Sequence, residues 1–178
     1  MSRSVMLSVR PKWCEKIISG EKTVEVRKNR PKLETPFKCY IYETQGYVEK
    51  DGIMVFRLGG RVIGEFTCDR IYELETRSPG GSYYVKGEGQ PTTNDVARQS
   101  CLTLKDMHEY LQSKVGYGWH ISDFVIYDEP KKLSEFKGLC KVESDCCACP
   151  YYNYSKMDCD GRTIKRPPQS WCYVEAME

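Results

Sequence analysis

Short segments rich in β-branched and aromatic residues recur along this chain of 178 residues, separated by turn-forming residues. Six or seven of them have the length and composition of strands, at residues 5–9, 23–27, 37–42, 53–57, 61–68, 117–127 and 170–174. A sheet of many short strands usually closes on itself, because closure removes unpaired edges. We therefore expect an α+β fold, a small, mixed and mostly antiparallel β-barrel flanked by short helices.

Two helices are predicted beside these strands. The first covers residues 11–19, where Pro11 suits the first helical turn and Gly20 suits a left-handed end. The second covers residues 103–113, where Thr103 and an aspartate three residues later resemble a capping box. Both segments repeat apolar residues at helical spacing.

The remaining segments are predicted to be loops and turns. Residues 46–51 and 76–100 are rich in turn-forming and polar residues, and we expect both to be loops. The strands at 53–57 and 61–68 are predicted to form a hairpin around Gly59.

The composition fits a single domain covering residues 1–178, with 40% hydrophobic and 29% charged residues. The net charge is only +2, but residues 10–32 hold eight basic and three acidic residues, a local charge of +5. Such a segment favours phosphate, although a solvated helix face would have the same composition. No segment has the apolar length of a membrane span or a signal peptide, so we expect a cytoplasmic protein without a membrane partner.

The segment from Gly20 to Arg27 concentrates groups that can bind a ligand. Alternation along a strand places Glu25 and Arg27 on one face, with Lys22 at the turn before it. An acceptor between two cationic donors suits a base or amide edge together with an anion. The alternative is an exposed strand that carries a surface ion pair of little energetic consequence.

These residues carry a family resemblance. The segment at 7–11, the helix after it and the Gly-x-Lys-x-x-Glu-x-Arg pattern at 20–27 resemble the signature of ASCH domains. Segments 117–123 and 167–174 are similar to parts of longer ASCH proteins of Firmicute genomes and their prophages. The resemblance implies a PUA-like β-barrel and, by analogy with PUA domains, RNA or a nucleoside- or nucleotide-like ligand.

The ligand-binding residues predicted for this cleft come from several segments. Arg10 and Lys12 lie where a helix begins and can hold a phosphate. Trp119 can stack on a base or pack in the core, and His120 can act as acid, base or donor. The complete predicted set is Arg10, Lys12, Lys22, Glu25, Arg27, Trp119, His120 and Ser170.

A hydrolase is the alternative function. One bacterial branch with a similar fold is an amidohydrolase of N4-acylated cytidines, in which a lysine is proposed to activate a threonine three residues later. Lys22 matches this lysine, but Glu25 occupies the position of the threonine. The candidate catalytic residues are therefore Lys22 and Glu25, with the glutamate as a base and the lysine stabilising an oxyanion. The same two groups can also neutralise each other without any chemistry.

Half of the ten cysteines fall within residues 140–159. Cys140, Cys146, Cys149 and Cys159 match the four thiolates of a closed structural zinc site, and Cys147 can replace Cys146. We expect residues 139–165 to be a zinc-stabilised insertion and residues 166–178 to supply the last strand. The alternative is a loop with free thiols. If zinc is present, a third possible function is a protein-interaction module whose zinc loop binds a protein partner.

Overall fold

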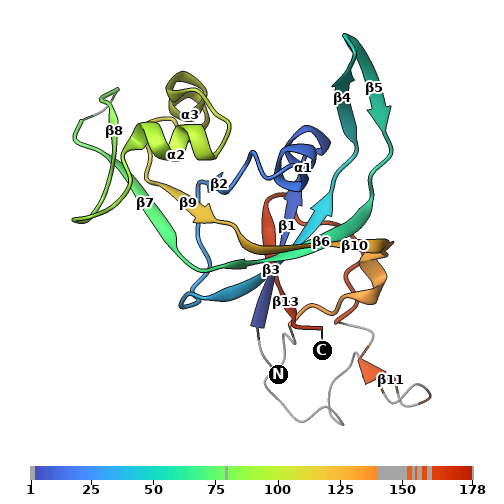
Figure 1. Ribbon diagram of the computed structural model, residues 1–178. Coiled ribbons are helices and arrows are strands. Elements are labelled where there is room, and N and C mark those ends of the chain that lie inside the picture. The colour runs from blue at the N-terminus through green and yellow to red at the C-terminus, as the bar shows by residue number, and fades with distance from the viewer. Residues whose placement is uncertain are drawn as a thin grey trace. The chain divides into compact units, whose positions relative to one another are not determined.

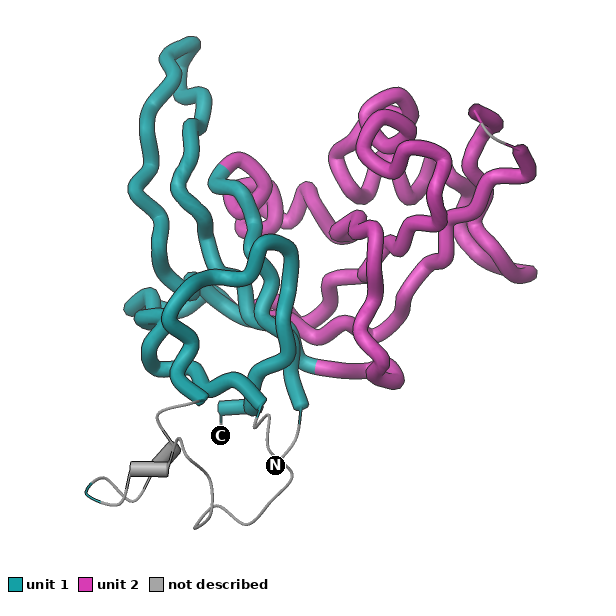
Figure 2. The backbone as a smooth tube through the Cα atoms, turned by 180° about the vertical axis from the view of Figure 1, so that it is seen from behind, with its two compact units in different colours: residues 1–11, 38–65, 126–178 teal, residues 12–37, 66–125 magenta. Residues whose placement is uncertain are grey.

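The computed structural model describes residues 3–78, 80–139, 152–153, 155, 158–159 and 162–177. The chain divides into two compact units, coloured separately in Figure 2. Unit 1 comprises Met1–Pro11, Lys38–Glu65 and Ile126–Glu178, and unit 2 comprises Lys12–Phe37 and Phe66–Val125. Each unit is described by itself.

A mixed five-stranded sheet accounts for most of unit 1. Its strands are β1 (Arg3–Val9), β3 (Phe37–Glu43), β6 (Arg61–Cys68), β10 (Ser122–Lys131) and β13 (Trp171–Glu175). Their order is β10-β6-β3-β1-β13, with β1 parallel to β3 and antiparallel to β13. Alternate side chains of these strands point into a common apolar core, which contains Met6, Tyr40, Val62, Phe136 and Val174.

The other elements of unit 1 are short. A hairpin joins β4 (Gly46–Lys50) to β5 (Ile53–Arg57). A 3₁₀ turn, η1, covers Leu133–Glu135, and the strands β11 (Tyr152–Asn153) and β12 (Asp158–Cys159) pair with each other.

The hairpin corrects two predictions. The expected loop at 46–51 is largely strand, and β5 pairs with β4 instead of with the segment 61–68. Asp51 and Gly52 explain the difference, because both have positive φ, of 51° and 77°. An Asp-Gly pair of this geometry is a preferred two-residue hairpin turn.

Unit 2 consists of a four-stranded antiparallel sheet and three helices (Figure 1). The sheet order is β2 (Val24–Arg27), β9 (Gly116–His120), β7 (Ile71–Thr76) and β8 (Tyr83–Val85). The helices are α1 (Pro11–Ile18), α2 (Thr93–Gln99) and α3 (Leu104–Leu111). The α2 and α3 helices pack on one face of the sheet, through a core that contains Val24, Leu74, Val96, Met107 and Leu111.

The predicted fold class is confirmed, with mostly antiparallel strands and short helices. Among the described residues the strand pairings form open sheets, and they do not close into the ring that the sequence led us to expect. The predicted strand 117–127 is two strands, β9 and β10, which belong to different sheets. The expected loop 76–100 contains β8 and α2. No helix in the described part of the chain is long and apolar enough to cross a membrane.

Candidate functional site

The turn between α1 and β2 places Lys22 under the surface of unit 2. Gly20 ends the helix with a φ of 77°, and the Lys22 amide then donates to the Lys16 carbonyl at 2.8 Å. The Lys22 side chain is only 3% exposed. Its ammonium group donates to the Val24 carbonyl at 2.9 Å and to the Ser100 carbonyl at 2.8 Å.

Glu25 lies between two cations. Its Oε2 atom is 3.1 Å from the Lys22 ammonium, and its Oε1 atom is 2.9 Å from the Nη2 atom of Arg27. Glu25 and Arg27 are each 8% exposed. We call Lys22, Glu25 and Arg27 the buried charge cluster. It carries two positive charges and one negative charge, which leaves a net charge of +1.

The electrostatics of the cluster keep Glu25 ionised. Burial raises the pKa of this carboxyl. The charges of Lys22 and Arg27, together with their hydrogen bonds, lower the pKa by more than burial raises it. The pKa therefore lies below the ordinary value of a glutamate. A buried carboxylate with two cationic partners is fully ionised at neutral pH and fixes both cations in place.

Lys22 has little freedom to act as a base. An ammonium group has three hydrogens, and Lys22 has three acceptors, which are two carbonyl oxygens and the Glu25 carboxylate. Deprotonation removes a charge that Glu25 needs, and it leaves one of the buried acceptors without a donor. The geometry therefore favours a structural and electrostatic role for Lys22 over activation of a nucleophile.

Aromatic side chains border the cluster, and each has an ammonium group over its ring. The Lys12 ammonium lies 4.3 Å from the centre of the Trp13 ring, and that of Lys22 lies 5.1 Å from the same ring. The Lys28 ammonium lies 5.1 Å from the centre of the Tyr110 ring. Trp13 is partly exposed and Tyr110 is 40% exposed, so both rings are accessible from solvent.

Tyr110 of α3 belongs to the surroundings of the cluster. Burial raises the pKa of its hydroxyl, and the charges of Arg27 and Glu25 act on it in opposite directions. The backbone of Lys28 also hydrogen-bonds to this hydroxyl. We did not single out Tyr110 from the sequence. The sequence feature that could have indicated this residue is an aromatic side chain on the polar side of a predicted helix.

Trp119 does not reach the surface. Its side chain is 0% exposed, and its ring packs edge-on against Phe37 with the ring centres 5.9 Å apart. The pairing of Glu25 with Trp119 places both residues on the same face of the sheet, but the indole is part of the core. Of the two roles that the sequence left open for Trp119, the structure shows the one in the core, and Trp119 does not line a ligand site.

His120 lies on the other face of the sheet. It pairs with Val24, and neighbouring residues of a strand point to opposite sides, so His120 and Glu25 do not share a face. The Nδ1 atom of His120 is 2.5 Å from the Oδ1 atom of Asp69, in the turn between β6 and β7. His120 thus contacts Asp69 and does not belong to the buried charge cluster.

The remaining predicted residues are not members of the buried charge cluster. Lys12 is exposed at the start of α1, beside Trp13. Arg10 and Ser170 belong to unit 1, where Arg10 is exposed and the Ser170 carbonyl accepts from the Ser8 amide at 2.9 Å. The predicted zinc ligands Cys140, Cys146 and Cys149, with Cys147, lie outside the described residues, as does the Cys159 side chain. No group of potential metal ligands occurs among the residues that are described.

Two solved structures of similar fold are forms of ASCH from Zymomonas mobilis. The crystal structure of ASCH from Zymomonas mobilis is 18% identical, with a TM-score of 0.56 over 97% of this chain and 87% of that chain. A serine-to-alanine variant of the Zymomonas protein gives a TM-score of 0.55 at 18% identity, over 97% and 88% of the two chains. At this identity the likeness concerns the fold alone.

The sequence itself identifies the family. No curated protein sequence matches the chain. The family model of the ASCH domain matches residues 7–127, which include α1, the buried charge cluster, Tyr110 and His120. This match covers more than half of the sequence, and the chain therefore belongs to the ASCH domain family.

Proposed function

We propose that this protein is an RNA-binding module and that the surface of unit 2 around the buried charge cluster contacts the RNA. The observation that carries the proposal is the shared carboxylate of Glu25. The cluster contains two buried cations and one buried anion, so its three groups together carry a net charge of +1 below the surface. Charges in a poorly solvated environment act over longer distances than exposed ones, and this excess attracts a phosphate.

The aromatic border supports the same class of ligand. Single-stranded nucleic acids bind where basic side chains follow the backbone and aromatic rings stack on bases. Trp13 and Tyr110 supply accessible rings, and Lys12 and Lys28 supply exposed ammonium groups beside them. Family membership adds support by analogy, because ASCH domains are proposed to bind RNA in the manner of PUA domains.

Catalysis is not part of the proposal. The hydrolase alternative needs Glu25 to act as a base and Lys22 to bind an oxyanion. The neighbouring cations lower the pKa of Glu25, which makes it a weak base, and all three hydrogens of the Lys22 ammonium already have buried acceptors. The zinc-loop alternative depends on cysteines outside the described residues, and it stays a prediction.

Salt-dependent binding tests the proposal. Binding of a short single-stranded RNA, followed by fluorescence anisotropy, should weaken as salt rises, because each phosphate contact releases counterions. The double variant Lys12→Ala, Lys28→Ala should weaken binding. It should also reduce the slope of log K against log salt by about 0.7 for each phosphate contact that is lost.

A second variant controls for the loss of an exposed positive charge elsewhere on the chain. Lys50→Ala removes an exposed positive charge from β4 and should leave the slope unchanged. Tyr110→Leu should weaken binding by roughly 1–3 kcal/mol without changing the slope, because a stacked ring contributes no charge. Affinity that does not respond to salt, or a double variant that binds like Lys50→Ala, would overturn the proposal.

A further inference from the structure

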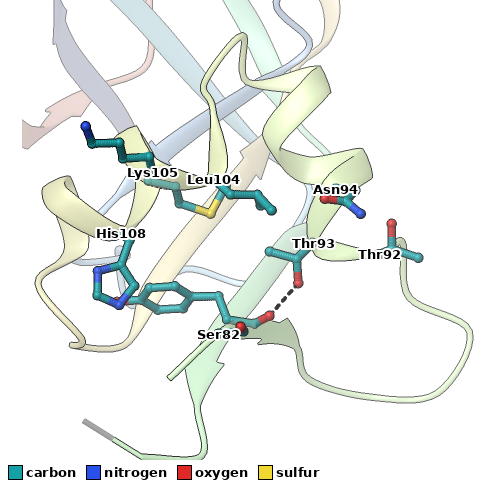
Figure 3. A pocket seen from close by; sticks show the side chains of 9 residues that line it. Ser82, Thr92, Thr93, Asn94, Leu104, Lys105 and His108 are labelled. Atoms are coloured by element: carbon teal, nitrogen blue, oxygen red, sulfur yellow. Dashed lines mark hydrogen bonds between the residues drawn. The ribbon is translucent and has the colours of Figure 1, made fainter. Parts of the chain in front are cut away.

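A second candidate binding site lies in unit 2, away from the residues of the buried charge cluster. A pocket of about 510 Å³ opens among the end of the loop before β8, the start of α2 and the first turns of α3 (Figure 3). This volume is typical of pockets that bind small molecules, which range over roughly 300–1,000 Å³. None of its nine lining residues belongs to the cluster.

The pocket combines apolar walls with polar groups on two sides. Met107 and Tyr83 are buried beneath it, whereas Leu104 is 49% exposed at its rim. Figure 3 shows Thr93 and Asn94 on the side opposite His108. A ligand with a flat ring suits this pocket, because the face of the ring can pack against the apolar walls. Polar atoms at the edges of the ring can form hydrogen bonds with the polar groups.

Hydrogen bonds within the unit fix one polar side. The Thr93 hydroxyl donates to the Tyr83 carbonyl at 2.8 Å, which ties α2 to β8. The capping box of Thr92 and Asp95 holds the same helix end. For the Asn94 amide and the Ser82 hydroxyl, no partner is found among the described residues, so both are available to a ligand.

His108 provides the strongest indication of a ligand. Its Nε2 atom is buried and has no hydrogen-bond partner among the described residues. A buried polar atom without a partner costs about 1–3 kcal/mol, so such atoms are commonly satisfied by water or by a ligand. The imidazole packs edge-on against Tyr83, with the ring centres 5.8 Å apart, and the His108 side chain is partly exposed.

The charges around the pocket favour a neutral or anionic ligand. The lining includes Lys105, whose side chain is largely exposed, and it includes no carboxylate. The nearby carboxylates of Asp95 and Asp106 accept hydrogen bonds in the capping boxes of α2 and α3. Glu109 is 3.9 Å from the Lys105 ammonium, a loose and exposed pair that an incoming anion can replace.

We propose that this pocket binds the base of a single nucleotide, and the inference rests on the proposed function. The base lies against Leu104. The His108 imidazole turns toward the base, and its Nε2 atom and the Asn94 amide form hydrogen bonds with the edges of the base. Lys105 at the rim contacts the phosphate. The nucleotide is either free or part of an RNA chain whose backbone follows the surface around the buried charge cluster.

Titrations with the four nucleoside 5′-monophosphates, their nucleosides and inorganic phosphate test the proposal. Calorimetry measures affinity, and amide NMR shifts locate the site. His108→Phe keeps a ring of similar shape but removes the nitrogens, and it should weaken nucleotide binding roughly tenfold. The melting temperature should not fall, because the variant removes a buried polar atom without a partner. Lys105→Ala should weaken the binding of monophosphates more than the binding of nucleosides. Lys50→Ala should weaken the binding of neither.

The outcomes separate this inference from the proposed function. If RNA binds with the expected salt dependence but nucleotides shift no pocket residue, the pocket inference is overturned and the RNA proposal stands. If nucleotides bind the pocket of the wild type but not of His108→Phe, and RNA does not bind the wild type, the pocket inference is supported and the RNA proposal is overturned. If inorganic phosphate alone reproduces the pocket shifts, base recognition is overturned. Competition between RNA and a mononucleotide for the pocket would identify RNA as the source of the base.

Discussion

The ammonium group of Lys22 lies 3.1 Å from the Oε2 atom of Glu25, and both side chains are almost completely buried. The two residues are three positions apart, at the end of a turn and inside the strand that follows it. Arg27 binds the second carboxylate oxygen, at 2.9 Å. Within the cluster, Glu25 is therefore the residue that contacts both cations.

Replacement of the shared carboxylate should destabilise the protein strongly. Glu25→Gln removes the negative charge and leaves Lys22 and Arg27 as buried cations close to each other. Loss of one partner of a buried pair costs about 3–5 kcal/mol in free energy of unfolding. Urea denaturation followed by circular dichroism measures the change.

Glu49→Gln is the matched control, because Glu49 is exposed on β4. It should change the free energy of unfolding by no more than about 0.5 kcal/mol. A Glu25→Gln protein as stable as this control would show that the cluster does not hold unit 2 together.

The stability of the wild-type protein should fall in acid through Glu25. The pKa of Glu25 in the folded state lies below the ordinary value of 4.5, because Lys22 and Arg27 outweigh the effect of burial. The stabilisation that ionised Glu25 provides is therefore complete above pH 4.5. It is lost as the pH falls from 4.5 through the folded-state pKa. Urea midpoints measured down this range should decline less steeply in Glu25→Gln than in the wild type. Equal slopes in the two proteins would contradict the lowered pKa.

The pKa of Asp69 should depend on its contact with His120. Burial raises the pKa of Asp69, but the hydrogen bond and charge of His120, with the charge of Arg70, bring it below the ordinary value. His120→Leu removes the first of these partners, so the Asp69 pKa should rise. Carboxyl ¹³C NMR titration measures it. Asp106 should titrate unchanged in the same spectra, because its pKa is lowered mainly by the hydrogen bonds of Thr103.

Local parts of the site could be predicted from the sequence. The helix predicted at 11–19 is α1, which ends at Ile18, and the strand predicted at 23–27 is β2, which begins at Val24. Alternation correctly placed Glu25 and Arg27 on one face. These features depend on neighbouring residues, and a residue pattern contains that information.

The burial of the cluster could not be predicted in this way. The Lys22 ammonium donates to the carbonyl of Ser100, which is 78 positions away, and Tyr110 comes from a different helix. We expected residues 76–100 to be a loop because of their polar composition. The capping box of Thr92 and Asp95, which opens α2, was visible in the sequence and was missed.

Purified protein should contain about one zinc ion per chain, since four thiolates match a closed structural site. Elemental analysis measures the content, and Cys149→Ser should lower it toward zero. Cys101→Ser is the matched control, because Cys101 is a single, partly exposed cysteine in unit 2 that should not bind the metal. Separate Cys146→Ser and Cys147→Ser variants should differ, and the one that loses zinc identifies the fourth ligand. A zinc content near zero in the wild type would remove both the predicted site and the protein-interaction alternative that depends on it.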